Sequence, residues 1–398
     1  MKPGSWPAIL CVYLFGVCGG TTVTKIVPLS ADFARIFGIG PAGFGWLVSL
    51  IAVPAVLLAI PSGLLADRVG PRAVLIGGAA LGIIANLLYL AAGSVPMLQA
   101  ARLIEGIAIV HIYTAGPALL MAMTDGGRRT SAMTVWTTYM PVGTAIGLAL
   151  GGTFSASAAW RSVFIGHGIM FVIAAAVGLL LPVMRAGGRG TRPGIGGQLI
   201  DLRAAYARPA LLLVALAFFL MISLGLGANV TFPEYFARIE ALSMAESSNM
   251  VAAATLGMIP GSLLAGLALR RGVSHMRLFG VLACLGFVAG TASFVPGLPL
   301  STRDVVLPVW FFISGAATAM VMAVLPLVAE PERHGAAAAL LNQVASVATF
   351  INPPLWLSFA SGDDWTPFAA LMGGGWLIAA IALWGATRRT FTATPQAA

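Results

Sequence analysis

The feature that most constrains this chain is a series of long apolar stretches joined by short polar turns. Each stretch has about the 20 apolar residues that an α-helix needs to cross a bilayer. Open strands are excluded because they would leave their backbone groups unpaired in lipid. The sequence therefore predicts an all-α integral membrane protein with twelve spans, at residues 6–28, 43–65, 72–93, 96–123, 130–153, 161–184, 209–231, 246–269, 275–296, 304–328, 335–359 and 366–387.

The composition fits a chain that lies almost entirely in the bilayer. Of its 398 residues, 59% are hydrophobic and 9% are charged, whereas soluble domains average about 25% charged residues. The first stretch begins near Trp6 and lacks a small-residue cleavage site, which favours a retained span over a signal peptide. The three cysteines, Cys11, Cys18 and Cys284, show no disulfide or metal-ligand spacing. We expect the protein to use no metal and no cofactor.

The distribution of basic residues predicts the orientation. With the N-terminus in the cytoplasm, most of the 22 lysines and arginines fall on the cytoplasmic side, as the positive-inside rule requires. The outer side and its span ends hold Lys25, Arg35, Arg161, Arg238 and Arg303. This asymmetry accounts for the net charge of +9 without a nucleic-acid partner. We expect a multi-pass protein of the cytoplasmic (inner) membrane with both termini cytoplasmic.

The chain divides into two halves. Residues 185–208 are rich in glycine and carry five arginines, which predicts a flexible cytoplasmic linker between residues 1–184 and 209–398. A short repeat supports duplication, because Phe33-Ala-Arg-Ile36 recurs as Phe236-Ala-Arg-Ile239, an offset of 203 residues. We therefore expect six spans in each half.

A polar loop between the second and third stretches carries a family pattern. The loop reads Gly63-Leu-Leu-Ala-Asp-Arg-Val-Gly-Pro-Arg72. It resembles the G-x-L-x-D-R-x-G-R-R loop of the major facilitator superfamily (MFS), and the matching positions are Gly63, Leu65, Asp67, Arg68, Gly70 and Arg72. Pro71 departs from the pattern. The resemblance implies two six-helix bundles, related by pseudo-two-fold symmetry, that rock about a central cavity.

Other stretches resemble the same family. Arg102-Leu-Ile-Glu-Gly106 is similar to the R-x-x-Q-G pattern of span 4, and Trp160-Arg161 is similar to the opening of span 6. The run from Val135 to Gly143 resembles the cyanate-permease branch. Span 5 partly resembles the glycine-rich span 5 of antiporters, through Gly143, Gly147, Gly151 and Gly152. It lacks the Gly-Pro pair that is usual there.

The resemblance implies a gate at the loop. In the family, the acid at the position of Asp67 docks one half onto the other when the cavity faces outward. Arg72 and Asp125 can pair across the same surface, and an exposed pair is worth about 0–1 kcal/mol, which biases a conformation without locking it. The gating residues would be Gly63, Asp67, Arg68, Gly70, Arg72 and Asp125. The alternative is a loop that only sets the topology.

Two charged residues in span 4 are candidates for proton coupling. Arg102 and Glu105 lie three residues apart, which places both side chains on one helix face. A charged residue within a span is costly and faces the protein interior. Glu105 would titrate and Arg102 would modulate it. The alternative is a permanent structural ion pair.

Lys25 is the candidate for binding an anionic substrate. It lies near the outer end of span 1, and its repeat position in the second half is Ala228. The alternative is a lysine that extends to the outer headgroups. Further polar and aromatic side chains could line the cavity or act as interhelical hydrogen-bond partners, and these are Trp136, Tyr139, Asn229, Asn342 and Gln343.

An enzyme is not expected, because the chain has no phosphate-binding loop, no nucleophile elbow and no metal spacing among its histidines. The sequence predicts a monomeric secondary transporter of a small solute, an organic anion or small metabolite, coupled to protons. Efflux of amphipathic drugs or metabolites is an alternative. An alternative of another class is a non-transporting membrane sensor on the same scaffold.

Overall fold

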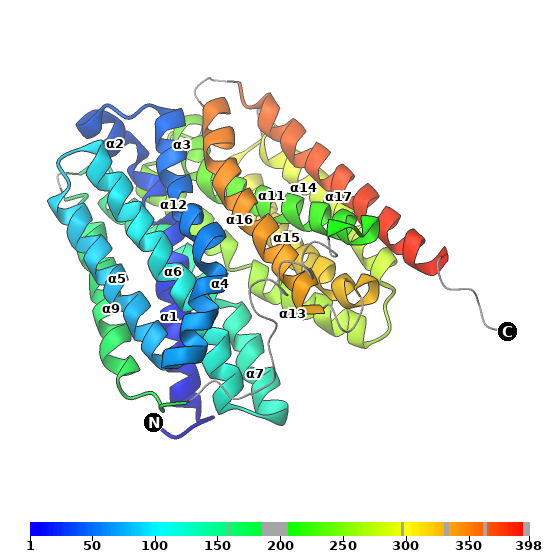
Figure 1. The fold of residues 1–398 in the computed structure, drawn as a ribbon. Helices are drawn as coiled ribbons and strands as arrows, with labels where there is room; N and C mark the ends of the chain where they lie inside the picture. The colour runs from blue at the N-terminus through cyan, green and yellow to red at the C-terminus, as the bar shows by residue number, and fades with distance from the viewer. Residues whose placement is uncertain (158, 185–205, 296–297, 330–333, 361–363, 393–398) are drawn as a thin grey trace. The chain divides into compact units, whose positions relative to one another are not determined.

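The computed structural model describes the chain except residues 158, 185–205, 296–297, 330–333, 361–363 and 393–398. The described residues form helices joined by turns, without strands (Figure 1). In the first half the helices are α1 (Trp6–Thr24), η1 (Val27–Leu29), α2 (Ser30–Phe37), α3 (Pro41–Ser49), η2 (Leu50–Ala52), α4 (Val53–Val69), α5 (Pro71–Ala91), α6 (Val95–Met123), α7 (Gly126–Thr137), α8 (Tyr139–Phe154) and α9 (Ser162–Gly178). In the second half they are α11 (Pro209–Ile239), α12 (Met244–Thr255), α13 (Met258–Arg270), α14 (His275–Ser293), α15 (Leu300–Val328), α16 (His334–Phe359) and α17 (Thr366–Thr392).

The prediction of an all-helical membrane protein is confirmed. Nine helical segments among the described residues are long and apolar enough to cross a membrane. The three predicted spans outside this set correspond to α7 with α8, to α9 and to α16. A turn at Thr138 separates α7 from α8, and α9 has 17 residues. The count of twelve spans stays a prediction.

The chain packs as two compact units. Unit 1 holds the described residues of Met1–Gly190, Val230–Ala252 and Pro353–Ser358. Unit 2 holds those of Thr191–Asn229, Ala253–Asn352 and Phe359–Ala398. The predicted linker, residues 185–208, lies outside the described residues apart from 206–208, and the division into two six-span halves stays a prediction.

The repeated four-residue segments occupy similar places in the two halves. The first span is a helical run from Trp6 to Phe37, formed by α1, η1 and α2, and Phe33–Ile36 lies near its end. In the second half Phe236–Ile239 ends α11. Each segment thus lies at or near the end of the first helical run of its half, and the two runs have about the same length.

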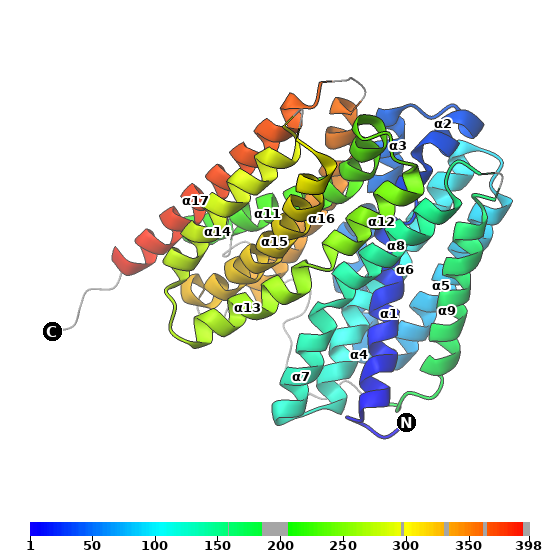
Figure 2. The same cartoon turned by 180° about the vertical axis from the view of Figure 1, so that it is seen from behind.

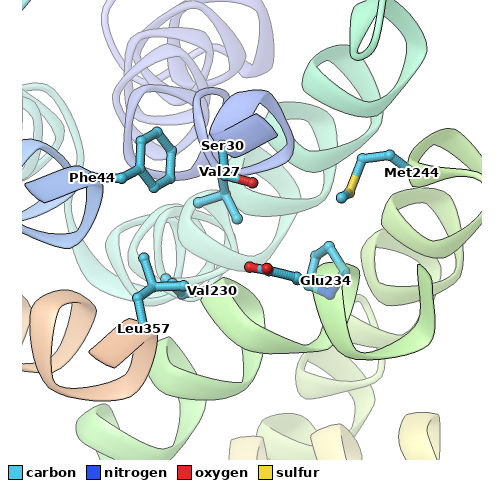
Figure 3. A pocket seen from close by; sticks show the side chains of 8 residues that line it. Val27, Ser30, Phe44, Val230, Glu234, Met244 and Leu357 are labelled. Atoms are coloured by element: carbon cyan, nitrogen blue, oxygen red, sulfur yellow. The ribbon is translucent and has the colours of Figure 1, made fainter. Parts of the chain in front are cut away.

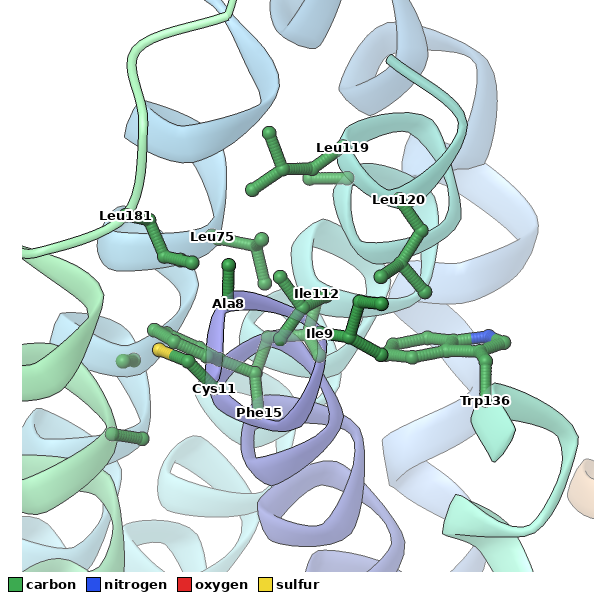
Figure 4. Packing of buried hydrophobic residues seen from close by; sticks show 14 of the residues in the cluster. Ala8, Ile9, Cys11, Phe15, Leu75, Ile112, Leu119, Leu120, Trp136 and Leu181 are labelled. Carbon is green, nitrogen blue, oxygen red and sulfur yellow. The ribbon is translucent and has the colours of Figure 1, made fainter. Parts of the chain in front are cut away.

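Helix α1 lies at the centre of unit 1, in contact with α6, α8 and α9 (Figures 1 and 2). Its residues are largely apolar on all sides, as expected for a helix that is buried or spans a membrane, and most of them are buried here. Phe15 is fully buried in a core with Leu75 of α5, Ile112 of α6 and Trp136 of α7 (Figure 4). This core fixes α1 against the helices that carry the charged side chains described below.

Helix α8 packs closely on the C-terminal end of α1 through a row of glycines. A methyl group at Gly143 would lie 2.6 Å from the Cα of Gly20. One at Gly147 would lie 3.0 Å from the backbone nitrogen of Lys25, and one at Gly151 would collide with its carbonyl oxygen. The glycines that resemble those of antiporters therefore have a packing role here, since they let α8 touch the α1 backbone at Lys25.

In unit 2, α15 contacts α13, α14 and α17. Close approaches again occur at glycines. A methyl group at Gly261 of α13 would collide with the carbonyl of Phe312 in α15, and one at Gly286 of α14 would collide with the indole of Trp376 in α17. Small residues at such positions let membrane helices approach one another closely.

Candidate functional site

Three charged side chains meet in the interior of unit 1. Lys25 at the end of α1 and Arg102 and Glu105 of α6 are each 0% exposed. The Lys25 ammonium lies 2.5 Å from Oε1 of Glu105. Nη1 of Arg102 lies 3.0 Å from the other carboxylate oxygen, Oε2. The carboxylate is therefore held between two cations, and we call these three residues the charge cluster.

The Lys25 ammonium has two further partners. It donates to Oδ1 of Asn86 at 2.6 Å and lies 2.7 Å from Nδ1 of His167. Together with the Glu105 ion pair, these contacts give the ammonium group three polar neighbours. Nε2 of His167 lies 3.0 Å from the carbonyl oxygen of Cys18, which can only accept, so Nε2 carries the proton and Nδ1 accepts from Lys25. His167 is thus neutral in this arrangement.

Arg102 ties the cluster to the backbone of two other helices. Its Nη1 donates to the carbonyl oxygen of Thr22 at 2.7 Å. Its Nη2 donates to the carbonyl oxygens of Val23 at 3.1 Å and Val48 at 3.2 Å. The flat guanidinium can reach acceptors on several sides at once, which an ammonium group cannot do.

Aromatic rings close the cluster. The Tyr89 hydroxyl donates to Oε2 of Glu105 at 2.9 Å, and its ring stacks on Phe164 with a centroid separation of 4.2 Å. The Lys25 ammonium lies 5.1 Å from the Tyr89 centroid and 4.9 Å from the Phe164 centroid. Such contacts between a cation and a ring face contribute to holding a charge away from water.

The formal charges of the cluster do not cancel. Lys25 and Arg102 each carry a positive charge, and Glu105 carries one negative charge. Buried charges are stable only when they are paired and hydrogen-bonded. One excess positive charge therefore remains in the buried interior of unit 1.

Sequence reasoning brought Arg102 and Glu105 together but treated Lys25 as a separate site. The structure places Lys25 on Glu105, with its side chain turned inward toward α6. It also adds Asn86, Tyr89 and His167, which the sequence analysis did not select. The sequence feature that could have indicated these three residues is their polarity within apolar stretches. The roles of these residues toward protons or substrate stay predictions.

A matching buried arginine lies in unit 2. Arg303 at the start of α15 is 1% exposed. It donates from Nη1 to the carbonyl oxygen of Ser293 at 2.7 Å and from Nη2 to that of Val295 at 3.0 Å. Arg303 therefore resembles Arg102 in burial and in its backbone acceptors.

The aromatic candidates of span 5 pack against one another. Trp136 and Tyr139 have ring centroids 4.7 Å apart, and Tyr139 lies 5.0 Å from the Tyr113 ring. A methyl group at Gly16 of α1 would lie 2.9 Å from Cβ of Tyr139. Trp136 is only 6% exposed and belongs to the hydrophobic core.

The amide candidates lie in unit 2 with different surroundings. Asn229 is buried and accepts from the Thr255 hydroxyl at 2.8 Å. Asn342 is exposed, whereas Oε1 of Gln343 accepts from the Tyr206 hydroxyl at 2.8 Å. The structure therefore shows separate hydrogen-bonded sites for Asn229 and Gln343 within this unit.

The candidate gating loop lies at the junction of α4 and α5. Gly70 has φ +93°, a conformation that favours glycine, and Asp67 and Arg68 are exposed in the last turn of α4. Gly63 lies one turn earlier. Arg72 and Asp125 are the other two candidates. Nη2 of Arg72 donates to the carbonyl oxygen of Leu179 at 2.5 Å, and the exposed Asp125 directly precedes α7.

A small pocket lies in unit 1 beside Glu234 (Figure 3). Its walls include Val27, Phe44 and Leu357, and the Glu234 carboxylate faces it. Oε1 of Glu234 accepts from Nη2 of Arg238 at 2.6 Å. The Glu234 carboxylate is therefore paired with the guanidinium of Arg238, which is partly exposed.

Comparison with known proteins agrees with this architecture. A sequence profile of the Major Facilitator Superfamily matches residues 9–353. The methylenomycin A resistance protein of Bacillus subtilis (strain 168) is 27% identical over 199 residues, which are 50% of this chain and 42% of that protein. The cephamycin export protein CmcT of Amycolatopsis lactamdurans is 36% identical over 171 residues, which are 42% of this chain and 35% of that protein. The chain thus spans less than half the length of these curated relatives.

Solved structures share the fold over the whole chain. A bacterial homolog of the human lysosomal transporter Spinster, in an inward-facing and unoccupied conformation, has a TM-score of 0.73 at 16% identity, over 98% of this chain and 97% of that one. The nucleoside transporter NupG has a TM-score of 0.75 at 14% identity, over 95% of this chain and 99% of that one. Because the family profile covers most of the sequence, this multi-pass membrane protein belongs to the major facilitator superfamily.

Proposed function

We propose that this protein is a secondary active transporter that moves a small solute across the cytoplasmic membrane by alternating access, coupled to protons. The observation that carries the coupling is the charge cluster of Lys25, Arg102 and Glu105. The solute is an organic anion or a small metabolite. The transporter acts as a monomer with both termini in the cytoplasm.

The coupling follows from the charge of the cluster. Arginine keeps its proton at any pH a cell meets, so the exchangeable proton belongs to the Lys25–Glu105 pair. Loss of one proton from the Lys25 ammonium would leave Arg102 and Glu105 as a neutral pair. A cluster that changes from one excess charge to none favours different surroundings in its two forms. Proton binding can thus bias the bundle between conformations.

Each of the remaining candidates is proposed as a substrate-binding residue within its own unit. Trp136 and Tyr139 supply aromatic surface, and Asn229, Asn342 and Gln343 supply hydrogen-bonding groups. The excess positive charge of the cluster favours an anion nearby. The loop that carries Asp67 would act as the gate.

The test is uptake into proteoliposomes across a panel of radiolabelled organic anions and small metabolites, with and without an imposed pH gradient. The wild-type protein should accumulate its substrate only when the gradient is present. Glu105→Gln and Lys25→Met should lose this accumulation yet still exchange substrate across the membrane. Glu234→Gln is the matched control, because its ion pair lies at the surface of the same unit.

Two results would overturn this proposal. If folded Glu105→Gln and Lys25→Met both kept full pH-driven accumulation, the cluster would be a structural element only. If no solute moved in any condition, a sensor on the same scaffold would replace the transporter.

Export of amphipathic compounds is the second candidate. It is favoured by the names of the relatives, which include a resistance protein, a cephamycin export protein and a probable multidrug-efflux transporter of Mycobacterium tuberculosis. Expression in a drug-sensitive bacterium separates the two. An exporter should raise the tolerated antibiotic concentration in a manner that depends on Glu105, whereas an importer of metabolites should leave it unchanged.

A further inference from the structure

A groove runs along the outside of unit 2 between α14 and α17. It has a volume of about 430 Å³ and is open on one side, and its lining includes Met276, Arg277, Phe279, Gly280, Ile381 and Trp384. Phe279 forms a buried floor at 1% exposure, while Ile381 is 59% exposed and Trp384 is 48% exposed. The walls are thus apolar and accessible from the lipid side.

The groove lies where the two helices are less tightly packed. Farther along α14, a methyl group at Gly286 would collide with the Trp376 indole, and one at Gly373 of α17 would lie 2.9 Å from the Phe287 ring. At Gly280 a methyl group would meet nothing within 4 Å. The exposed Gly280 therefore leaves room beside α14 that a larger residue would fill.

Two arginines mark one end of this groove. Arg277 is exposed and belongs to its lining. The guanidinium carbon of Arg388 lies 3.9 Å from the ring centroid of Trp384, which also lines the groove. Arginine pairs well with phosphate because its flat fork matches the phosphate oxygens. An apolar channel with two arginines at its mouth has the shape and charge of a site for an anionic amphiphile.

The position of this end selects the amphiphile. The arginines lie at the start of α14 and near the end of α17, and the positive-inside rule assigns this side to the cytoplasm. The cytoplasmic leaflet carries anionic lipids that attract basic residues near its surface. Tryptophan at the rim, as at Trp384, is typical of the headgroup level of a membrane.

We propose that this groove binds one anionic phospholipid of the cytoplasmic leaflet. The headgroup phosphate contacts Arg277 and Arg388, and an acyl chain lies against Phe279, Ile381 and Trp384. This site goes beyond the transport function, because it does not involve the charge cluster or the substrate.

The test uses the purified full-length protein, stripped of lipid and titrated with dioleoyl phosphatidylglycerol or dioleoyl phosphatidylcholine. Native mass spectrometry measures the bound fraction of each lipid. The wild-type protein should bind the anionic lipid more tightly. Arg277→Gln and Arg388→Gln should each weaken its binding about fivefold, equivalent to about 1 kcal/mol for each basic residue. Gly280→Leu should weaken the binding of both lipids, because it fills the groove.

Two control variants separate a site from general attraction. Arg128→Gln removes an arginine of unit 1 that lies 5.2 Å from the exposed Trp6 ring and does not line the groove. Gly266→Leu adds a side chain at a glycine of α13 that also has nothing within 4 Å. Both should bind lipid as the wild type does. If Arg128→Gln weakened binding as much as the groove variants, or if Gly280→Leu left both lipids bound, the proposal would be overturned.

Discussion

The Lys25 ammonium lies 2.5 Å from the Glu105 carboxylate, although the two residues are 80 positions apart and neither is exposed to solvent. Arg102 holds the second oxygen of the same carboxylate. Glu105 is therefore the one negative charge on which two buried positive charges depend. We therefore expect the loss of the Glu105 charge to destabilise the protein more than the loss of the Lys25 charge.

Glu105→Gln should destabilise the protein more than Lys25→Met. The first change leaves two cations without their anion, and breaking a buried ion pair in this way costs about 3–5 kcal/mol. The second leaves the neutral pair of Arg102 and Glu105. Thermal unfolding in detergent should give the lower midpoint for Glu105→Gln, with Glu234→Gln close to wild type because its pair is partly exposed. An equal or lower midpoint for Lys25→Met would contradict the charge account.

Arg102→Lys and Arg303→Lys form a matched pair. Each replaces a buried guanidinium that bonds to backbone carbonyl oxygens with an ammonium that cannot reach them all. Lost hydrogen bonds to a charged group are worth about 1.5–3 kcal/mol each, so both variants should unfold at lower temperature. Only Arg102→Lys should also change the pH dependence of uptake. The same change of pH profile in Arg303→Lys would place coupling outside the cluster.

Asp67→Asn should slow transport while the protein still folds and inserts. In the proposed gate, the carboxylate makes a charge-assisted contact in one conformation only. Loss of such a contact, worth about 1.5–3 kcal/mol, shifts a two-state equilibrium more than about tenfold. Initial rates in proteoliposomes measure the effect, and Asp67→Glu should keep more of the rate. Transport at the wild-type rate in Asp67→Asn would assign the loop to topology alone.

Ala156→Gly should stabilise the protein. Ala156 has φ +53°, and its backbone N–H donates to Oδ2 of the buried Asp32 at 2.8 Å. Glycine adopts this conformation without the steric cost that alanine has, a difference of about 1 kcal/mol, and it keeps the N–H. The thermal midpoint should rise. Ala80→Gly, in the interior of α5, should lower the midpoint because glycine is a poor helix former.

Sequence patterns predicted the helical membrane architecture because a span is a local property of about 20 residues. They also placed Arg102 and Glu105 on one face, since three residues make nearly one helical turn. The contact of Lys25 with Glu105 could not be predicted this way, because it depends on how α1 packs against α6. The same holds for Asn86 and His167, whose apolar neighbours gave no indication of which helix they face. Span 5 did not appear as one helix because a turn at Thr138 divides it.

The side chains around the charge cluster all come from α1 and its C-terminal end, α5, α6 and α9, with backbone support from α1 and α3. Every one of them lies between residues 18 and 167. The electrostatic core can therefore be inherited as a single block of sequence. Helices encoded later in the chain can diverge without any change to the residues that hold this buried charge.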